Sequence, residues 1–253
     1  MGGVKTPQPG ALAVVTGASS GIGAVFARKL AARGYRLLLV ARRRDRLERL
    51  AAEFPGRAEP FPADLADERA LLTVEQRIAG DESLELLVNN AGFGALGRFF
   101  ETTVDQHDRM HRLHVTATMR LTHAALGGMV RRNRGGVINV SSVAAFGQSP
   151  GNVSYCATKA WMNVFTSTLD LDLRSAGSAV KVQALCPGFT YSDFHETMGV
   201  DRDKIPRPLW LEAEYVVDES LRAFDRGQVI AIPSWRYKAI ARDRKSTRLN
   251  SSH

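Results

Sequence analysis

Three side chains in the second half of the sequence have the types and spacing needed for proton transfer. Ser142 is followed thirteen residues later by Tyr155, and Lys159 stands four residues after the tyrosine. Residues i and i+4 share one face of a helix, so the Tyr155 phenol and the Lys159 ammonium can converge. A free phenol has a pKa of about 10, and a nearby cation stabilises its phenolate. The spacing therefore predicts a tyrosine of lowered pKa that exchanges a proton with a substrate oxygen to which Ser142 is hydrogen-bonded.

A glycine-rich segment near the N-terminus predicts a phosphate-binding turn. The sequence Gly17-x-x-x-Gly21-x-Gly23 stands between an apolar run and an amphipathic run, as at the junction of a strand and a helix. Glycines let the backbone approach a pyrophosphate closely, and a helix N-terminus presents unpaired N–H groups to it. A Gly-rich turn that binds no ligand is the alternative, which this context disfavours. The expected dinucleotide contacts here are Gly17, Ser19, Ser20, Gly21, Ile22 and Gly23.

The residues after the second predicted strand indicate which dinucleotide is bound. A site for NAD(H) commonly has a carboxylate there for the ribose hydroxyls, whereas this chain has Arg42, Arg43 and Arg44. A guanidinium can bind a 2′-phosphate through two hydrogen bonds. We therefore expect NADP(H) in preference to NAD(H), held first by Arg42 and second by Arg43, unless Arg43 and Arg44 merely point into solvent. Asp64, after the third predicted strand, would bind the adenine amino group with Leu65 beside it, or cap the following helix.

These motifs need a scaffold in which strands and helices alternate. Alternation of short apolar runs with amphipathic segments is typical of a mostly parallel sheet with helices on both faces. We predict an α/β, Rossmann-type, doubly wound fold with a seven-stranded sheet in a single domain. Pro60 and Pro62 suit an edge strand, which the third strand is in the order 3-2-1-4-5-6. The predicted strands are 11–16, 36–42, 58–61, 84–89, 137–141, 180–186 and 229–233. The predicted helices are 21–33, 45–54, 67–79, 104–132, 154–176 and 211–225.

Composition limits the other classes of function. The chain has 253 residues, of which 44% are hydrophobic, enough for a substantial core. No run approaches the ~20 apolar residues of a membrane span. Cys156 and Cys186 give no disulfide framework, so we expect a cytoplasmic protein. The net charge of +8 comes without a recognised nucleic-acid module, so we expect no nucleic-acid partner, and no metal site is predicted.

The last eleven residues differ from the rest of the chain. Residues 243–253 match the in-frame translation of a common sequencing adapter, so we interpret them as foreign to the natural protein. They contain three basic residues and one acidic residue, so without them the net charge falls from +8 to +6. We expect one domain over residues 1–242, with its natural C-terminal end missing.

Further motifs follow the glycine turn in a fixed order. They are formed by Asn89, Asn90, Ala91, Gly92, Ser142, Tyr155, Lys159, Pro187, Gly188 and Thr190. This order resembles the short-chain dehydrogenase/reductase family over residues 11–238. The resemblance implies hydride transfer between NADP(H) and a carbonyl or secondary alcohol, with Tyr155 as general acid/base and Lys159 on the nicotinamide ribose. It also implies cofactor contacts from Asn90, Ala91, Gly92, Tyr155, Lys159, Pro187, Gly188 and Thr190.

One position departs from the family pattern. In the family, an asparagine in the helix after Asn-Asn-Ala-Gly holds a water that connects the catalytic lysine to solvent. Here His114 stands at that position. A histidine can also bind a water and carry a proton, so the relay could persist or be impaired. A sequence error is a third interpretation, and the bland alternative is a residue that only fills space at a helix irregularity. His114 is thus the fourth catalytic candidate.

The residues around the trio suggest the substrate class. The residues expected to line the cleft together with Ser142 and Tyr155 are Phe93, Gly94, Val143, Ala144, Phe146, Gln148, Pro150 and Phe189. With residues 190–208 as a lid, this predicts a mostly apolar carbonyl or alcohol.

Two expectations concern the protein as a whole. An NADP-binding regulatory or scaffold protein with impaired catalysis is the rival function, which the presence of all three catalytic residues disfavours. The family resemblance also implies a homodimer or homotetramer formed through the helices 104–132 and 154–176.

Overall fold

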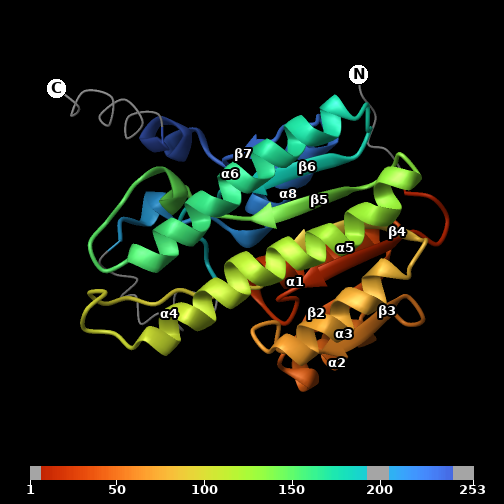
Figure 1. Ribbon diagram of the computed structural model, residues 1–253, viewed down its shortest axis with the longest axis horizontal. Coiled ribbons are helices and arrows are strands. Elements are labelled where there is room, and N and C mark those ends of the chain that lie inside the picture. Colours follow the sequence, from red (N-terminus) through yellow and green to blue (C-terminus); the bar gives the residue numbers. More distant parts are fainter. Residues whose placement is uncertain (1–6, 193–204, 242–253) are drawn as a thin grey trace.

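The fold is built on one parallel β-sheet, seen in a computed structural model that describes residues 7–192 and 205–241. Within these residues the sheet has seven strands in the order β3-β2-β1-β4-β5-β6-β7 (Figure 1). The order reverses between β1 and β4, which is the switch point where such sheets bind ligands. The strands are β1 (Leu12–Thr16), β2 (Arg36–Ala41), β3 (Ala58–Pro62), β4 (Leu84–Asn89), β5 (Gly136–Val140), β6 (Lys181–Leu185) and β7 (Ile230–Ala231).

Helices connect successive strands, so the predicted α/β fold class is confirmed. Residues 235–241 are also helical. The predicted foreign segment 243–253 and most of the predicted lid lie outside the described residues. The helical elements are α1 (Gly21–Ala32), α2 (Arg44–Ala52), α3 (Glu68–Ala79), α4 (Val104–His111), η1 (Arg112–Ala117), α5 (Thr118–Arg131), η2 (Val143–Phe146), α6 (Val153–Ser175), η4 (Arg207–Leu209) and α8 (Ala213–Asp225).

The side chains of each central strand alternate between two apolar layers, one on each face of the sheet. Ala13 and Val15 of β1 pack in one layer with Phe26 of α1 and with residues of α2 and α8. Leu12 and Val14 pack in the other layer with α3 and α5. Figure 1 shows α5 and α6 crossing the front of the sheet. Burial on both faces explains the continuous apolar runs of the strands.

Prolines lie in or next to the two edge strands of the sheet, where a missing backbone N–H is tolerated. β3 is an edge strand, so Pro60 and Pro62 cost the sheet little, as predicted. β7, at the other edge, pairs with β6 at only two positions, Ala184 with Ile230 and Leu185 with Ala231. It is shorter than the predicted strand 229–233, because Pro233 has no N–H to donate.

The helix predicted over residues 104–132 is interrupted, and this is the main difference from the expected elements. The π-helical turn η1 separates α4 from α5 and contains His114. Such turns insert an extra residue into a helix and are frequent at functional sites. His114 is completely buried, so the irregular turn directs a polar ring into the interior of the protein.

Candidate active site

The glycine turn between β1 and α1 has the shape of a phosphate cradle. Gly17 has φ +65, and a Cβ on Gly23 would lie 2.3 Å from the carbonyl oxygen of Gly17. A side chain at either position would therefore strain or block the turn. Ser20, at the N-terminus of α1, makes no side-chain cap to the helix, and the first turn of α1 has no acidic residue. The positive end of α1 is thus open to an anionic group.

Arg42 and Arg43 follow β2 and line the same cavity as the glycine turn. The guanidinium Nη2 of Arg43 donates to Ser19 Oγ at 3.1 Å and to Ser20 Oγ at 3.0 Å. Arg43 therefore does not simply point into solvent; it places a positive charge over the turn. Arg42, the first choice for a 2′-phosphate, is exposed at the rim of the cavity.

Asp64 lies at the adenine end expected for the cavity, but it already has a protein partner. Arg109 of α4 donates to Asp64 Oδ2 at 2.5 Å, and the Ala66 N–H donates to Asp64 Oδ1 at 3.1 Å. Burial opposes ionisation, but these hydrogen bonds hold the pKa of Asp64 below its ordinary value. The alternative role as a helix cap is wrong, because Asp67 caps α3 through the Ala70 N–H. Sequence reasoning missed Arg109, because no motif marks a contact between α4 and the β3–α3 loop.

Asn90 joins β4 to the glycine turn. Its Nδ2 donates to the carbonyls of Thr16 at 2.9 Å and Gly17 at 3.2 Å, while Thr16 Oγ1 accepts the N–H groups of Asn90 and Ala91. These bonds fix the ends of β1 and β4 at the switch point. Leu65, Asn90, Ala91 and Gly92 line the cavity, as expected for cofactor contacts.

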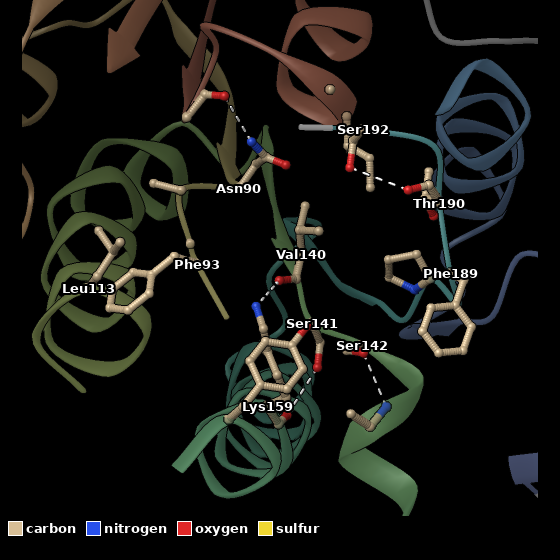
Figure 2. Close-up of a pocket in the computed structure, with 18 of the residues that line it drawn as sticks. Asn90, Phe93, Leu113, Val140, Ser141, Ser142, Lys159, Phe189, Thr190 and Ser192 are labelled. Atoms are coloured by element: carbon tan, nitrogen blue, oxygen red, sulfur yellow. Dashed lines mark hydrogen bonds between the residues drawn. The ribbon is translucent and has the colours of Figure 1, made fainter. Parts of the chain in front are cut away.

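The three residues of the proton-transfer motif converge at the other end of this cavity. Ser142 follows β5, and Tyr155 and Lys159 lie in the first turns of α6; all three line the cavity. Ser142 Oγ accepts the Ala144 N–H at 3.1 Å. Lys159 Nζ donates to the Val140 carbonyl at 2.7 Å and lies 5.8 Å from the centre of the Tyr155 ring. Figure 2 shows Lys159 pointing to the end of β5, beside Ser141 and Ser142.

Burial shifts the ionisation of Tyr155 and Lys159 in the protein alone. Burial raises the pKa of Tyr155 to about 12, and a hydrogen bond with Ser142 offsets this only in part. Burial also lowers the pKa of Lys159 to about 8. Without a bound nicotinamide the pKa of Tyr155 is therefore raised, because loss of hydration is the largest effect on its phenol. The lowering expected in the working enzyme, from Lys159 and an oxidised nicotinamide together, stays a prediction.

His114 makes contacts that its position in the sequence did not reveal. Its Nε2 accepts the Phe93 N–H at 3.1 Å, and its Nδ1 lies 3.0 Å from Thr158 Oγ1. Burial, followed by the charge of Lys159, holds the pKa of His114 well below its ordinary value. His114 is thus a neutral ring with both nitrogens bonded to protein groups.

The expected substrate residues are only partly brought together. Phe93 and Phe189 line the cavity together with Ser142 and Tyr155, but Phe146 does not. Val143 and Ala144, which were also expected there and belong to the same turn η2, line the cavity. Phe146 is half-buried elsewhere on the turn, and Gly94, Gln148 and Pro150 are not among the lining residues. Further apolar lining residues, which sequence reasoning missed, are Leu96, Leu113, Leu209 and Ile240.

Tyr237 is a further residue that the sequence analysis did not single out, like Arg109. Its hydroxyl accepts the Phe189 N–H at 3.0 Å and donates to the Leu209 carbonyl at 2.7 Å. A Cβ on Gly188 would lie 2.0 Å from the Tyr237 ring. The helical residues 235–241 thereby hold the Pro187–Thr190 segment, whose members Pro187, Gly188 and Thr190 line the cavity.

Comparison with known proteins agrees with this fold and identifies the family. A family model described as short chain dehydrogenase matches residues 11–203. Nodulation protein G of Rhizobium meliloti (strain 1021) is 38% identical over 184 residues, which cover 72% of this chain and 74% of that protein. A short-chain dehydrogenase from Sphingobium yanoikuyae in complex with NADPH is 34% identical, with a TM-score of 0.85 over 96% of each chain. The chain therefore belongs to the short-chain dehydrogenase/reductase family.

A second solved structure is similar over nearly the whole chain. It is the bulky-bulky ketone specific alcohol dehydrogenase from Comamonas testosteroni, which is 31% identical with a TM-score of 0.80. The match covers 97% of this chain and 96% of that protein. The nucleotide-binding oxidoreductase fold predicted from the sequence is thus confirmed. No helix among the described residues is both long enough and apolar enough to cross a lipid bilayer.

Proposed function

We propose that this protein is an NADP(H)-dependent oxidoreductase that interconverts a carbonyl compound and a secondary alcohol of mostly apolar character. The observation that carries the proposal is a cavity of about 850 Å³ that extends from Arg42 and Arg43 to Ser142, Tyr155 and Lys159. When bound, the reduced nicotinamide supplies a hydride. The glycine cradle and the positive end of α1 would hold the pyrophosphate, and Arg42 and Arg43 would hold the 2′-phosphate.

Tyr155 is the proposed general acid. With its pKa raised to about 12, its phenol is protonated at neutral pH, so it is ready to donate a proton to a carbonyl oxygen. The Ser142 hydroxyl would bind the same oxygen and stabilise the charge that develops on it. In the reverse direction Tyr155 would accept the hydroxyl proton. Lys159, buried beside the tyrosine, would hold the ribose hydroxyls and favour the phenolate once the proton has left.

Support for an apolar substrate comes from the wall of the cavity beside Tyr155. Phe93 and Leu113 lie on one side of it, and Phe189, Leu209 and Ile240 contribute further apolar surface (Figure 2). The similar protein from Comamonas testosteroni acts on bulky ketones. A ketone with two sizeable apolar substituents is therefore the substrate class to test first.

Replacing Tyr155 with phenylalanine tests the proposal. Tyr155→Phe should lower kcat for ketone reduction by about 10³-fold or more, since a general acid contributes ~10²–10⁴-fold, while the Kd for NADPH changes little. Turnover would be followed by loss of NADPH absorbance over a panel of bulky ketones, and binding by NADPH fluorescence. Thr168→Ser, a conservative change on the same helix, is the control for effects of expression and purification. Tight NADPH binding by the wild-type protein without turnover of any ketone would instead favour the regulatory role.

The proposal extends to a cytoplasmic homodimer or homotetramer. Helix α6 exposes the apolar side chains of Val153, Val164 and Leu171, and α5 lies on the same side of the sheet (Figure 1). An exposed apolar face of this kind is typical of a surface that is covered in an assembly. Sedimentation equilibrium at micromolar protein checks this, and a monomer would refute it.

A further inference from the structure

The hydrogen bonds of His114 define its protonation state. The Phe93 N–H can only donate, so His114 Nε2, 3.1 Å away, accepts and carries no proton. The Thr158 hydroxyl donates its single proton to the Tyr155 carbonyl at 3.0 Å. Thr158 Oγ1 must therefore accept a hydrogen bond from His114 Nδ1, which lies 3.0 Å away. The ring is thus the neutral tautomer with its proton on Nδ1.

The surroundings of the ring leave little space for a bound water. His114 is 0% exposed, and a Cβ on Gly92 would lie 2.9 Å from its Nε2. The Tyr155 ring packs against it edge-on, with 6.0 Å between ring centres. A proton relay needs a nitrogen that can exchange its partner, and here each ring nitrogen is bonded to a protein group.

We infer that His114 is a positioning residue, a neutral bridge that fixes the Phe93 backbone relative to the Tyr155 turn of α6, and not a proton relay. One end of the bridge is the segment after β4, whose Phe93 lines the cavity. The other end is Thr158, whose hydroxyl is bonded to the Tyr155 carbonyl. The bridge thereby sets the distance between one wall of the cavity and the proposed general acid. This inference rests on the proposed function, because it concerns the geometry of the same reaction.

The protonation state can be measured on the wild-type protein without any assay of activity. Long-range ¹H–¹⁵N NMR spectra of histidine-labelled protein, assigned by comparison with His114→Gln, should show protonated Nδ1 and bare Nε2. The pattern should not change between about pH 5.5 and 8.5, because a buried neutral ring does not titrate there. A proton on Nε2, or a titration within this range, would overturn the inference. If ketone reduction is not the function, this result still stands by itself.

Paired variants test the bridge during turnover. Asparagine places its amide near the position of Nδ1, so His114→Asn keeps a donor for Thr158 and loses the bond to Phe93. Thr158→Val breaks the opposite end of the bridge with the histidine intact. Each should lower kcat/KM for the ketone by about tenfold, the size expected for one buried hydrogen bond, with the Kd for NADPH within about twofold and no shift of the pH profile.

The double variant tests whether His114 and Thr158 act as one hydrogen-bonded bridge or affect activity independently of each other. If His114 and Thr158 act as one unit, His114→Asn with Thr158→Val should lose little more activity than either single change. Losses that multiply would overturn the inference. So would wild-type activity in His114→Asn with a shifted pH profile, which is the result expected of a relay.

Discussion

At the scale of single residues, burial decides how Tyr155 and Lys159 are ionised. Loss of hydration raises the pKa of the tyrosine to about 12 and lowers that of the lysine to about 8. Both shifts favour the uncharged form, as expected for groups removed from water. The buried lysine donates to the Val140 carbonyl at 2.7 Å, at the end of the strand that leads to Ser142.

The lowered pKa of Lys159 predicts how stability depends on pH. Between pH 8 and 10.5 the unfolded chain binds the Lys159 proton and the folded protein does not, so this group makes folding more favourable as the pH rises. The stability of the wild type relative to Lys159→Met should therefore increase as the pH rises from 8 to 10.5, in addition to a pH-independent loss in the variant from the missing Lys159–Val140 hydrogen bond. The shift of about 2.5 units corresponds to a change on the order of 3 kcal/mol. Urea unfolding of both proteins between pH 7 and 10 checks this, and a constant difference would contradict it.

At the scale of elements, the loop after β2 is hydrogen-bonded to the glycine turn at the N-terminus of α1. Arg43 is bonded to Ser19 and Ser20 of the glycine turn, whereas Arg42 lines the cavity at its exposed rim. The two arginines are adjacent in sequence but have different surroundings. We therefore expect different roles for them in binding the cofactor.

The charge at position 42 should determine the choice between cofactors. Arg42→Asp should weaken NADPH binding by at least about tenfold and NADH binding much less, because a bidentate phosphate contact becomes a repulsion. Arg43→Leu should weaken both, since it releases the turn that both share. Arg44→Asp is the control, because the Arg44 side chain is 68% exposed and pairs with Glu48. The Kd values would come from fluorescence titration, and equal losses of both cofactors in Arg42→Asp would refute the assignment.

At the scale of the whole molecule, segments far apart in the sequence close the cavity. Tyr237 connects the helical residues 235–241 to Phe189 and to Leu209. The Asp64–Arg109 ion pair similarly connects the β3–α3 loop to α4. These contacts form only when the complete sheet is assembled.

Removing the Tyr237 hydroxyl should weaken the attachment of residues 235–241 to Phe189 and Leu209. Tyr237→Phe leaves the Phe189 N–H and the Leu209 carbonyl without their partner, which should lower the free energy of unfolding by ~1–3 kcal/mol. Tyr215→Phe, at a side chain that is 42% exposed, should change it by less than about 0.5 kcal/mol. Urea denaturation of the two variants provides the comparison. Equal stability of both would show that the Tyr237 bonds contribute nothing.

Much of the fold could be predicted because it depends on local patterns. Strand and helix positions follow from the period of apolar residues, and the edge position of β3 agreed with Pro60 and Pro62. The predicted helix 104–132 did not contain the interruption at η1, although an irregularity at His114 was one alternative, because a single π-helical turn leaves no period of its own in the sequence. Phe146 was wrongly placed in the cavity for a similar reason, since the direction of a short turn depends on its packing.

The sequence by itself determined the family and the order of the motifs, and it predicted the reacting groups, because glycines, a Tyr–Lys pair and an arginine act through their own chemistry. Only the tertiary structure decided that Arg109 meets Asp64, that Tyr237 holds the Gly188 turn, and that both nitrogens of His114 are bonded. It also decided that burial raises the pKa of Tyr155 in the protein alone. Burial and long-range hydrogen bonds are properties of the assembled packing, and the spacing of residues along a chain does not contain them.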